Sequence, residues 1–307
     1  MRNIKLSIVY VTFAVLISAG FSSAQDYASA GTAFLRIGMD ARGSAMGGAM
    51  SASASGLDAL QWNPAGLFSA GSSELVFSHM RGLDDIDTEF FGFLWKKTEK
   101  HIFAFSVLSN NIGGIEQRTH PTDEPDGIIS SHDFYAGMSY ATVLNDKFEI
   151  GITAKYLYQK IFTYSATGFA ADFGVKYNLP EYDLVLGAAL KNIGSLGKLK
   201  SEKPEMPAML STGLLYKLPF LRDGDHTFNI TADYQMFFSG DDHVLGGFEY
   251  IFRNSYSIRG GFVSNYEERG LSFGGGINYK IYVLDYAYLP NVTSFGDNHL
   301  ITFRVKL

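Results

Sequence analysis

The sequence predicts an all-β protein, a transmembrane antiparallel β-barrel of about 14 strands with an N-terminal plug segment. The chain begins with the pattern of an export signal. From about residue 72 onward, apolar and polar residues alternate with a period of two. Behind the signal, no apolar run approaches the roughly 20 residues that a membrane-spanning helix needs. Because only helices and closed barrels satisfy every backbone hydrogen bond in lipid, a membrane protein with this pattern must be a barrel.

Residues 1–24 have the pattern of a secretory signal peptide. Arg2 and Lys5 form a basic start, 6–16 is almost wholly apolar, and small residues precede a cleavage site before Gln25. An uncleaved membrane anchor is the alternative, but the apolar run is too short for one. We therefore expect export and cleavage after residue 24.

Composition narrows the possible functions. Cysteine is absent, so neither a disulfide nor thiol chemistry is available. The formal net charge is −6, and two of the basic residues lie in the signal, so the exported chain is more acidic still. No basic stretch with interleaved aromatic residues is present, and we expect no nucleic-acid partner.

Residues 25–70 are expected to form the plug, and 71–307 the barrel. Small residues dominate 41–56, and they let backbone pack closely against backbone, as a segment inside a narrow lumen must. Asn63 suits the N-cap of a short helical turn, and Pro64 suits its first position. Trp62 is large enough to anchor the segment against the inner wall, where its indole N–H needs a polar partner. The candidate plug motif is Gly47, Gly48, Trp62, Asn63, Pro64, Ala65 and Gly66.

Each predicted strand has one apolar and one polar face. In 226–238, for example, Phe228, Ile230 and Ala232 alternate with Asn229 and Thr231. Such stretches match the 9–11 residues that cross a bilayer as a tilted strand. The predicted strands are 73–80, 87–96, 101–108, 131–142, 148–160, 166–178, 184–192, 209–217, 226–236, 242–252, 255–264, 270–279, 281–289 and 299–307.

The connections between these strands alternate between long and short. If both ends of the barrel lie in the periplasm, the long connections 109–130, 193–208 and 290–298 are extracellular. The connection 218–225 is a longer periplasmic exception. This alternation favours a barrel over a soluble sandwich.

Charged residues on the polar faces are expected to point into the lumen. Asp172, Asp233, Arg259 and Asp285 are the principal candidates. Two interpretations remain open: ion pairs that fill the barrel and hold the plug, or a polar conduit or ligand site. Opposite charges that are buried together need pairing in either case.

The two ends of the chain resemble the PorV/PorQ family and, more distantly, the FadL-type outer-membrane transporters. The N-terminal resemblance rests on the Asn63-Pro64-Ala65 element behind the small-residue stretch. The C-terminal resemblance rests on 285–288, with the sequence DYAY, followed by a polar loop and His299. The last strand resembles the C-terminal signal by which outer-membrane barrels are recognised for assembly, but it ends at Leu307 where an aromatic residue is usual. The resemblance implies a barrel plugged by its N-terminal segment.

No catalytic motif and no metal-ligand spacing stands out among the seven His, so we expect no enzyme activity and no cofactor.

The resemblance implies a part in type IX protein secretion, in which PorV-type barrels accept cargo and pass it to the surface-attachment machinery. Transport of hydrophobic small molecules is the alternative. It requires an apolar pocket beside Asn63 and a break in one strand. Gly113-Gly114 is the candidate for this break, although an ordinary loop turn is the plainer interpretation of these two glycines. Expected partners are outer-membrane lipid and lipopolysaccharide, the barrel-assembly machinery, and type IX components or secreted cargo.

Overall fold

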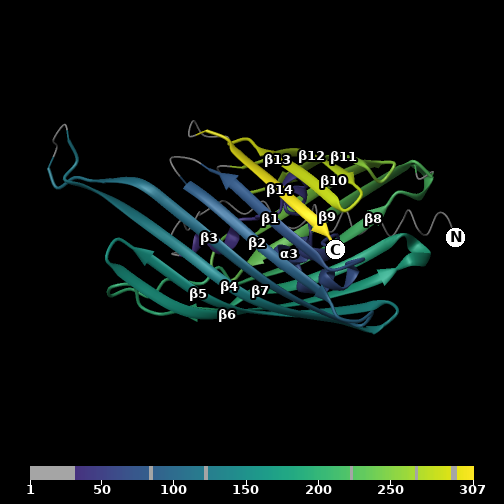
Figure 1. The fold of residues 1–307 in the computed structure, drawn as a ribbon, viewed down its shortest axis with the longest axis horizontal. Helices are drawn as coiled ribbons and strands as arrows, with labels where there is room; N and C mark the ends of the chain where they lie inside the picture. The colour runs from purple at the N-terminus through teal and green to yellow at the C-terminus, as the bar shows by residue number, and fades with distance from the viewer. Residues whose placement is uncertain (1–31, 83–85, 121–123, 222–223, 267–268, 292–295) are drawn as a thin grey trace.

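The computed structural model describes residues 32–82, 86–120, 124–221, 224–266, 269–291 and 296–307. The predicted signal peptide lies outside the described residues. Fourteen antiparallel strands form a closed barrel, in which each strand pairs with its sequence neighbours and β14 pairs with β1 (Figure 1). The prediction of an antiparallel barrel of about 14 strands is therefore confirmed.

The strands follow one another around the barrel in chain order. Their bounds are β1 Glu74–Arg81, β2 Ile86–Lys96, β3 His101–Gln117, β4 Gly127–Asn145, β5 Phe148–Ile161, β6 Tyr164–Leu179, β7 Leu184–Leu196, β8 Met209–Lys217, β9 His226–Phe237, β10 His243–Phe252, β11 Tyr256–Val263, β12 Leu271–Tyr279, β13 Tyr282–Leu289 and β14 Asn298–Lys306.

Strands β3 and β4 run well beyond their predicted ends. The connection predicted at 109–130 shrinks to 118–126, because polar residues continue both strands as a projecting hairpin (Figure 1). Gly113 and Gly114 therefore lie inside β3 and not in a loop turn. They coincide with a shift in the register between β3 and β4. The shift lies just beyond Ile112, and Ile112 is the residue of β3 that pairs with the first residue of β2. This irregularity leaves the β2–β3 ladder intact.

The two faces of the strands have opposite character. Along β5, Glu149, Thr153 and Lys155 are buried, whereas Ile152 and Tyr156 are exposed by 42% and 41%. A soluble protein would bury the apolar face, so an exposed apolar face all around a barrel is what lipid contact requires.

The N-terminal segment, residues 32–70, lies within the barrel (Figure 1). Its turn Ala41–Ala45 contacts β11 to β14, its turn Gly56–Asp58 contacts β1 and β2, and its last turn, Pro64–Ser69, contacts β3 to β6. Met39, Met46 and Leu67 are fully buried against the wall. The segment consists of η1 Ala33–Arg36, α2 Ala41–Ala45, η2 Gly56–Asp58, α3 Ala59–Trp62 and η3 Pro64–Ser69.

The described residues contain no helix that is both long and apolar enough to cross a membrane.

The two ends of the barrel differ. We call "turn end" the end with connections 97–100, 146–147, 180–183, 218–225, 253–255 and 280–281, two of which contain the short helices η4 Pro180–Tyr182 and η5 Pro219–Leu221. Leu307 also lies there, where its N–H donates to Ser73 O over 2.8 Å. We call "loop end" the opposite end, with connections 118–126, 197–208, 264–270 and 290–297 among others.

Candidate functional site

The candidate site is the interface between the N-terminal segment and the inner wall. It begins at Asp40, whose carboxylate is the N-cap of α2. Its Oδ1 accepts from Arg42 N over 3.1 Å, and its Oδ2 accepts from Gly43 N over 2.7 Å. The same Oδ2 accepts from Trp62 Nε1 over 3.2 Å. The buried Asp40 carboxylate thus accepts hydrogen bonds both from backbone N–H groups in the first turn of α2 and from the indole N–H.

Trp62 packs mainly against the segment itself. Its ring covers Gly38 and Gly43, where a Cβ would come within 2.7 Å and 2.5 Å of ring atoms. Toward the wall, Lys191 Nζ lies 5.7 Å from the ring centroid. The polar partner of the indole, Asp40, belongs to the segment and not to the wall.

Gly47 and Gly48 form a turn that needs glycine twice. Their φ angles are +67° and +79°, which side chains on L-residues rarely adopt. A Cβ on Gly47 would lie 2.7 Å from the backbone N and O of Phe262 in β11. The turn therefore lies directly on the barrel wall, where Gly47 N donates to Ser272 Oγ over 3.1 Å.

Asn63 joins the segment to two neighbouring strands. Its Oδ1 caps η3 by accepting from Ala65 N over 3.1 Å, and Pro64 is the first residue of that helix. Its Nδ2 lies 2.6 Å from Ser51 O, 3.1 Å from Val175 O in β6 and 3.3 Å from Ala188 O in β7.

Glycines of the wall make room for this element. A Cβ on Gly174 in β6 would lie 2.0 Å from Asn63 Oδ1, and one on Gly151 in β5 would lie 2.3 Å from Pro64 C. Within the segment, a Cβ on Gly66 would lie 2.3 Å from Ala54 O. The wall on one side and the rest of the segment on the other therefore approach residues 63–66 so closely that an added Cβ would not fit between them.

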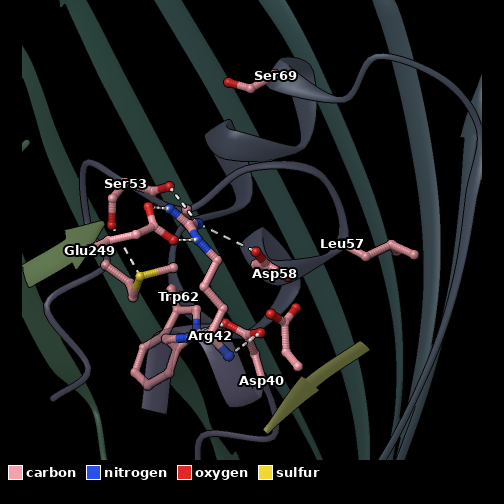
Figure 2. A network of polar contacts seen from close by, with 12 residues as sticks. Asp40, Arg42, Ser53, Leu57, Asp58, Trp62, Ser69 and Glu249 are labelled. Carbon is pink, nitrogen blue, oxygen red and sulfur yellow. Dashed lines mark hydrogen bonds and ion pairs between the residues drawn. The ribbon is translucent and has the colours of Figure 1, made fainter. Parts of the chain in front are cut away.

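Arg42 is the centre of a buried charge network that ties the segment to the opposite wall (Figure 2). Its Nε and Nη2 donate to the two carboxylate oxygens of Glu249 in β10 over 2.8 Å and 3.0 Å. Its Nη1 donates to Ser53 O over 3.2 Å and lies 3.4 Å from Asp58 Oδ2. Burial alone would lower the pKa of Arg42, but the charge and hydrogen bonds of Glu249 outweigh it and hold that pKa above its usual value.

Two of the predicted lumen residues extend this network. Arg259 donates through Nε to Glu249 over 2.9 Å and through Nη1 to Asp285 over 2.6 Å. Arg304 pairs with Asp58 on the segment. We name these six residues the Arg42 network: Arg42, Asp58, Glu249, Arg259, Asp285 and Arg304.

The other two predicted lumen residues lie elsewhere on the wall. Asp172 pairs with Lys155 over 2.6 Å and accepts from Asn192 N over 2.8 Å at a bulge in β7. Asp233 accepts from Ser51 N over 2.7 Å, and its Oδ1 has no hydrogen-bond partner among the described residues. The four candidates thus all face the interior, but the structure brings only Arg259 and Asp285 together.

Sequence reasoning missed several residues of the interface. Glu249 had a usable signal, because it alternates with Phe248 and Tyr250 in a predicted strand and so belongs to the inward face. Lys191 had a weaker signal, because the bulge beside it interrupts the alternation; its Nζ donates to Gln61 O over 2.5 Å. Asp40 and Arg42 had none, because the small-residue stretch around them has no periodicity.

Cavities lie on both sides of the segment. One of about 420 Å³ at the turn end is lined by the Arg42 network, Ser53 and Lys217 among others. Another of about 450 Å³ at the loop end is lined mostly by apolar atoms, including those of Trp62, Leu245 and Val263. Among the described residues, no group of three or more His, Asp or Glu side chains is placed to hold a metal ion.

Comparison with solved structures identifies proteins with a similar fold. The toluene transporter TbuX of Ralstonia pickettii has a TM-score of 0.63 at 15% identity, covering 88% of this chain and 98% of that one. The monoaromatic hydrocarbon channel CymD has a TM-score of 0.65 at 13% identity, covering 88% and 98%. The toluene transporter TodX of Pseudomonas putida has a TM-score of 0.61 at 14% identity, covering 87% and 97%. At these identities the likeness establishes the barrel fold alone.

Sequence comparison is more specific. No curated protein matches the chain. The sequence profile of the family described as "Type IX secretion system protein PorV" matches residues 22–178, which is just over half of the chain and includes the whole N-terminal segment. The fold and the family fit an outer-membrane protein. The chain therefore belongs to the PorV family of outer-membrane β-barrels.

Proposed function

We propose that this protein is a non-enzymatic outer-membrane barrel that assists type IX protein secretion or the attachment of its cargo at the cell surface. The observation that carries the proposal is the PorV match across the N-terminal segment and the first six strands. Its expected partners are components of the type IX system or secreted cargo, together with outer-membrane lipid, lipopolysaccharide and the barrel-assembly machinery.

The proposal divides the chain into a cleaved signal at 1–24, a plug at 25–70 and a barrel at 71–307. The buried hydrogen bonds of Asn63 and the ion pairs of Arg42 support a plug that is a fixed part of the barrel. With the lumen closed by this segment, contact with secretion components takes place on the outer surfaces and not through the pore.

A pull-down of the tagged, full-length protein from solubilised membranes, followed by mass spectrometry, tests this function. We expect large type IX components or their cargo to be retained. A second barrel of the same organism, tagged in the same way, controls for detergent carry-over. Recovery of lipid alone would contradict a secretion role.

Transport of a hydrophobic small molecule is the second candidate. The loop-end cavity of about 450 Å³ favours it, because its largely apolar lining lies beside Gly48 and Trp62 of the segment. Uptake of a radiolabelled monoaromatic compound by cells with and without the protein tests it. Equal uptake in the two strains would exclude this function for that class of compound.

A further inference from the structure

The outer face of β2, β3 and β4 carries a row of aromatic side chains at the turn end. Trp95 lies 6.1 Å from Phe103, and Phe103 lies 5.2 Å from Tyr140, between ring centroids. Trp95 is 50% exposed and Phe103 is 39% exposed. Aromatic rings at this level typically mark the boundary between the apolar core of a bilayer and its headgroups.

Two lysines of the turn 97–100 have no carboxylate partner among the described residues, and one of them, Lys97, lies beside this row. Lys97 Nζ stands 5.8 Å from the centroid of Trp95 and 5.9 Å from that of Phe103. Lys100 follows in the same turn, and neither lysine has a carboxylate within ion-pair distance among the described residues. The acidic residue of the turn, Glu99, is paired with Lys96 over 2.9 Å.

His101 completes the group. Its Nδ1 lies 2.8 Å from the hydroxyl of Tyr140, and the two rings are stacked with centroids 6.0 Å apart. When the hydroxyl donates to Nδ1, Nε2 carries the hydrogen and is a donor. The turn therefore carries two unpaired lysines and an imidazole N–H, and of these Lys97 and His101 lie against the exposed rings.

We propose that this patch, made of Trp95, Lys97, Lys100, His101, Phe103 and Tyr140, is a binding site for an anionic phospholipid. The phosphate is held by the lysines and the imidazole, and the acyl chains lie along the exposed rings below. Clusters of basic residues at a membrane boundary attract anionic lipids in this way. The inference rests on the membrane placement proposed above, and it adds a specific lipid class and location.

Other turns at the same end lack this combination. Lys147 is paired with Glu181 over 2.8 Å, and Arg253 with Asp225 over 3.1 Å. Lys280 lies 5.3 Å from the ring of Tyr279, but it is a single cation. At the turn end, unpaired positive charge beside several aromatic rings is thus concentrated at the β2–β3 turn among the described residues.

Fluorescence quenching tests the proposal directly. The chain has two tryptophans, Trp62 inside the barrel and Trp95 on its outer face. The full-length protein is reconstituted into vesicles that contain either brominated phosphatidylglycerol or brominated phosphatidylcholine, and the signal of Trp95→Phe is subtracted. We expect phosphatidylglycerol to be preferred at Trp95 by about fivefold or more, since one basic group near the surface contributes about a factor of five.

The double variant Lys97→Gln/Lys100→Gln should reduce that preference to nearly one. The matched control Lys147→Gln/Lys280→Gln removes two charges from the same end and should keep it. Equal quenching by the two lipids in the unmodified protein would overturn the site while leaving the membrane placement intact. Absence of quenching by either lipid would overturn both. Loss of preference in the control as well would show general surface charge and no site.

Discussion

At the scale of single residues, Asn63 has more to do than cap a helix. Its side chain is fully buried, and it accepts one backbone hydrogen bond while donating toward three carbonyls. Loss of a cap costs about 0.5–2 kcal/mol, and a buried carbonyl left without a donor costs about 1–3 kcal/mol more. The contribution of Asn63 to the free energy of unfolding is therefore expected to exceed that of a helix cap alone.

We expect Asn63→Ala to lower the free energy of unfolding by about 2–4 kcal/mol, as the sum of a lost cap and at least one unsatisfied carbonyl. The temperature at which the folded band converts to the unfolded band in detergent gels measures the loss. Asn278→Ala is the control, because Asn278 donates to Asn254 O over 3.0 Å at an exposed turn. Similar shifts of the unfolding temperature in the two variants would show that Asn63 contributes no more to stability than an amide at an exposed turn.

Glu249 is the acid on which the Arg42 network depends. It accepts from Arg42 through two bonds, from Arg259 through one and from Asn229 Nδ2 over 3.0 Å. Its removal leaves two buried guanidinium groups short of a counter-charge. Breaking a buried pair from one side costs about 3–5 kcal/mol.

Glu249→Gln should therefore destabilise the folded barrel by about 3–5 kcal/mol in the same gel assay, while keeping the shape of the side chain. Arg253→Gln supplies the comparison, since its pair with Asp225 is exposed and such pairs contribute about 0–1 kcal/mol. A double variant with Arg42→Met should recover part of the loss, because it removes one of the stranded charges. If Glu249→Gln proved as stable as Arg253→Gln, the network would not hold the segment.

At the scale of elements, the two faces of one strand should respond differently to charge. Ile230 on β9 is exposed to the outside, and arginine on the lipid face costs about 2–4 kcal/mol at the bilayer midplane. We expect Ile230→Arg and Tyr156→Arg to reduce the amount of folded barrel in the outer-membrane fraction. Ile230→Leu, which keeps the face apolar, should assemble normally. Normal assembly of both arginine variants would mean that this face does not meet lipid.

The inner face of the same strands has no free space for a long side chain. An inward-pointing arginine at Thr153 or Thr231 would be tolerated only if the lumen had room for it. Both threonines are buried, and Thr153 Oγ1 lies 2.7 Å from Ser139 Oγ. A Cβ on Gly247 would lie 2.5 Å from Thr231 Oγ1 and 2.8 Å from Met46 O of the segment. Because wall side chains at Thr153 and the segment at Thr231 already occupy this space, arginine there should hinder assembly through overpacking.

The sequence was informative about strands and less so about what lies between them. Alternation placed Ile230 outside and Asp233 inside without any structure, since a period of two determines the face of every residue. It failed at β3, where Ser109, Asn110 and Asn111 were taken for a loop. Polar residues end a membrane-crossing stretch, but they do not end a hairpin that continues beyond the bilayer.

The N-terminal segment was predictable only in part. Asn63 and Pro64 have local signals, because a cap and a fixed φ act within a few residues. Pairing of Arg42 with Glu249 joins residues 207 positions apart, and no local rule reports such a contact. The same holds for Trp62, whose partner Asp40 lies 22 positions away in a stretch without periodicity.

At the scale of the whole molecule, the segment divides the interior into two compartments with different access. Ser53 lines the turn-end cavity, and Asn298 lines the loop-end cavity. The chain has no cysteine, so a single cysteine at either place is a clean reporter. If the loop end faces outward and the segment closes the lumen, a reagent outside the cell reaches only one of them.

We expect Asn298→Cys to react with a membrane-impermeant thiol reagent on intact cells, and Ser53→Cys to react only after the outer membrane is permeabilised. Gel-shift labelling with a maleimide polymer measures both, and total cysteine after denaturation normalises the signal. Labelling of Ser53→Cys alone on intact cells would mean that the turn end faces outward. Labelling of both would mean that the reagent passes the segment, which would remove the basis for a closed plug and favour a conduit through the lumen.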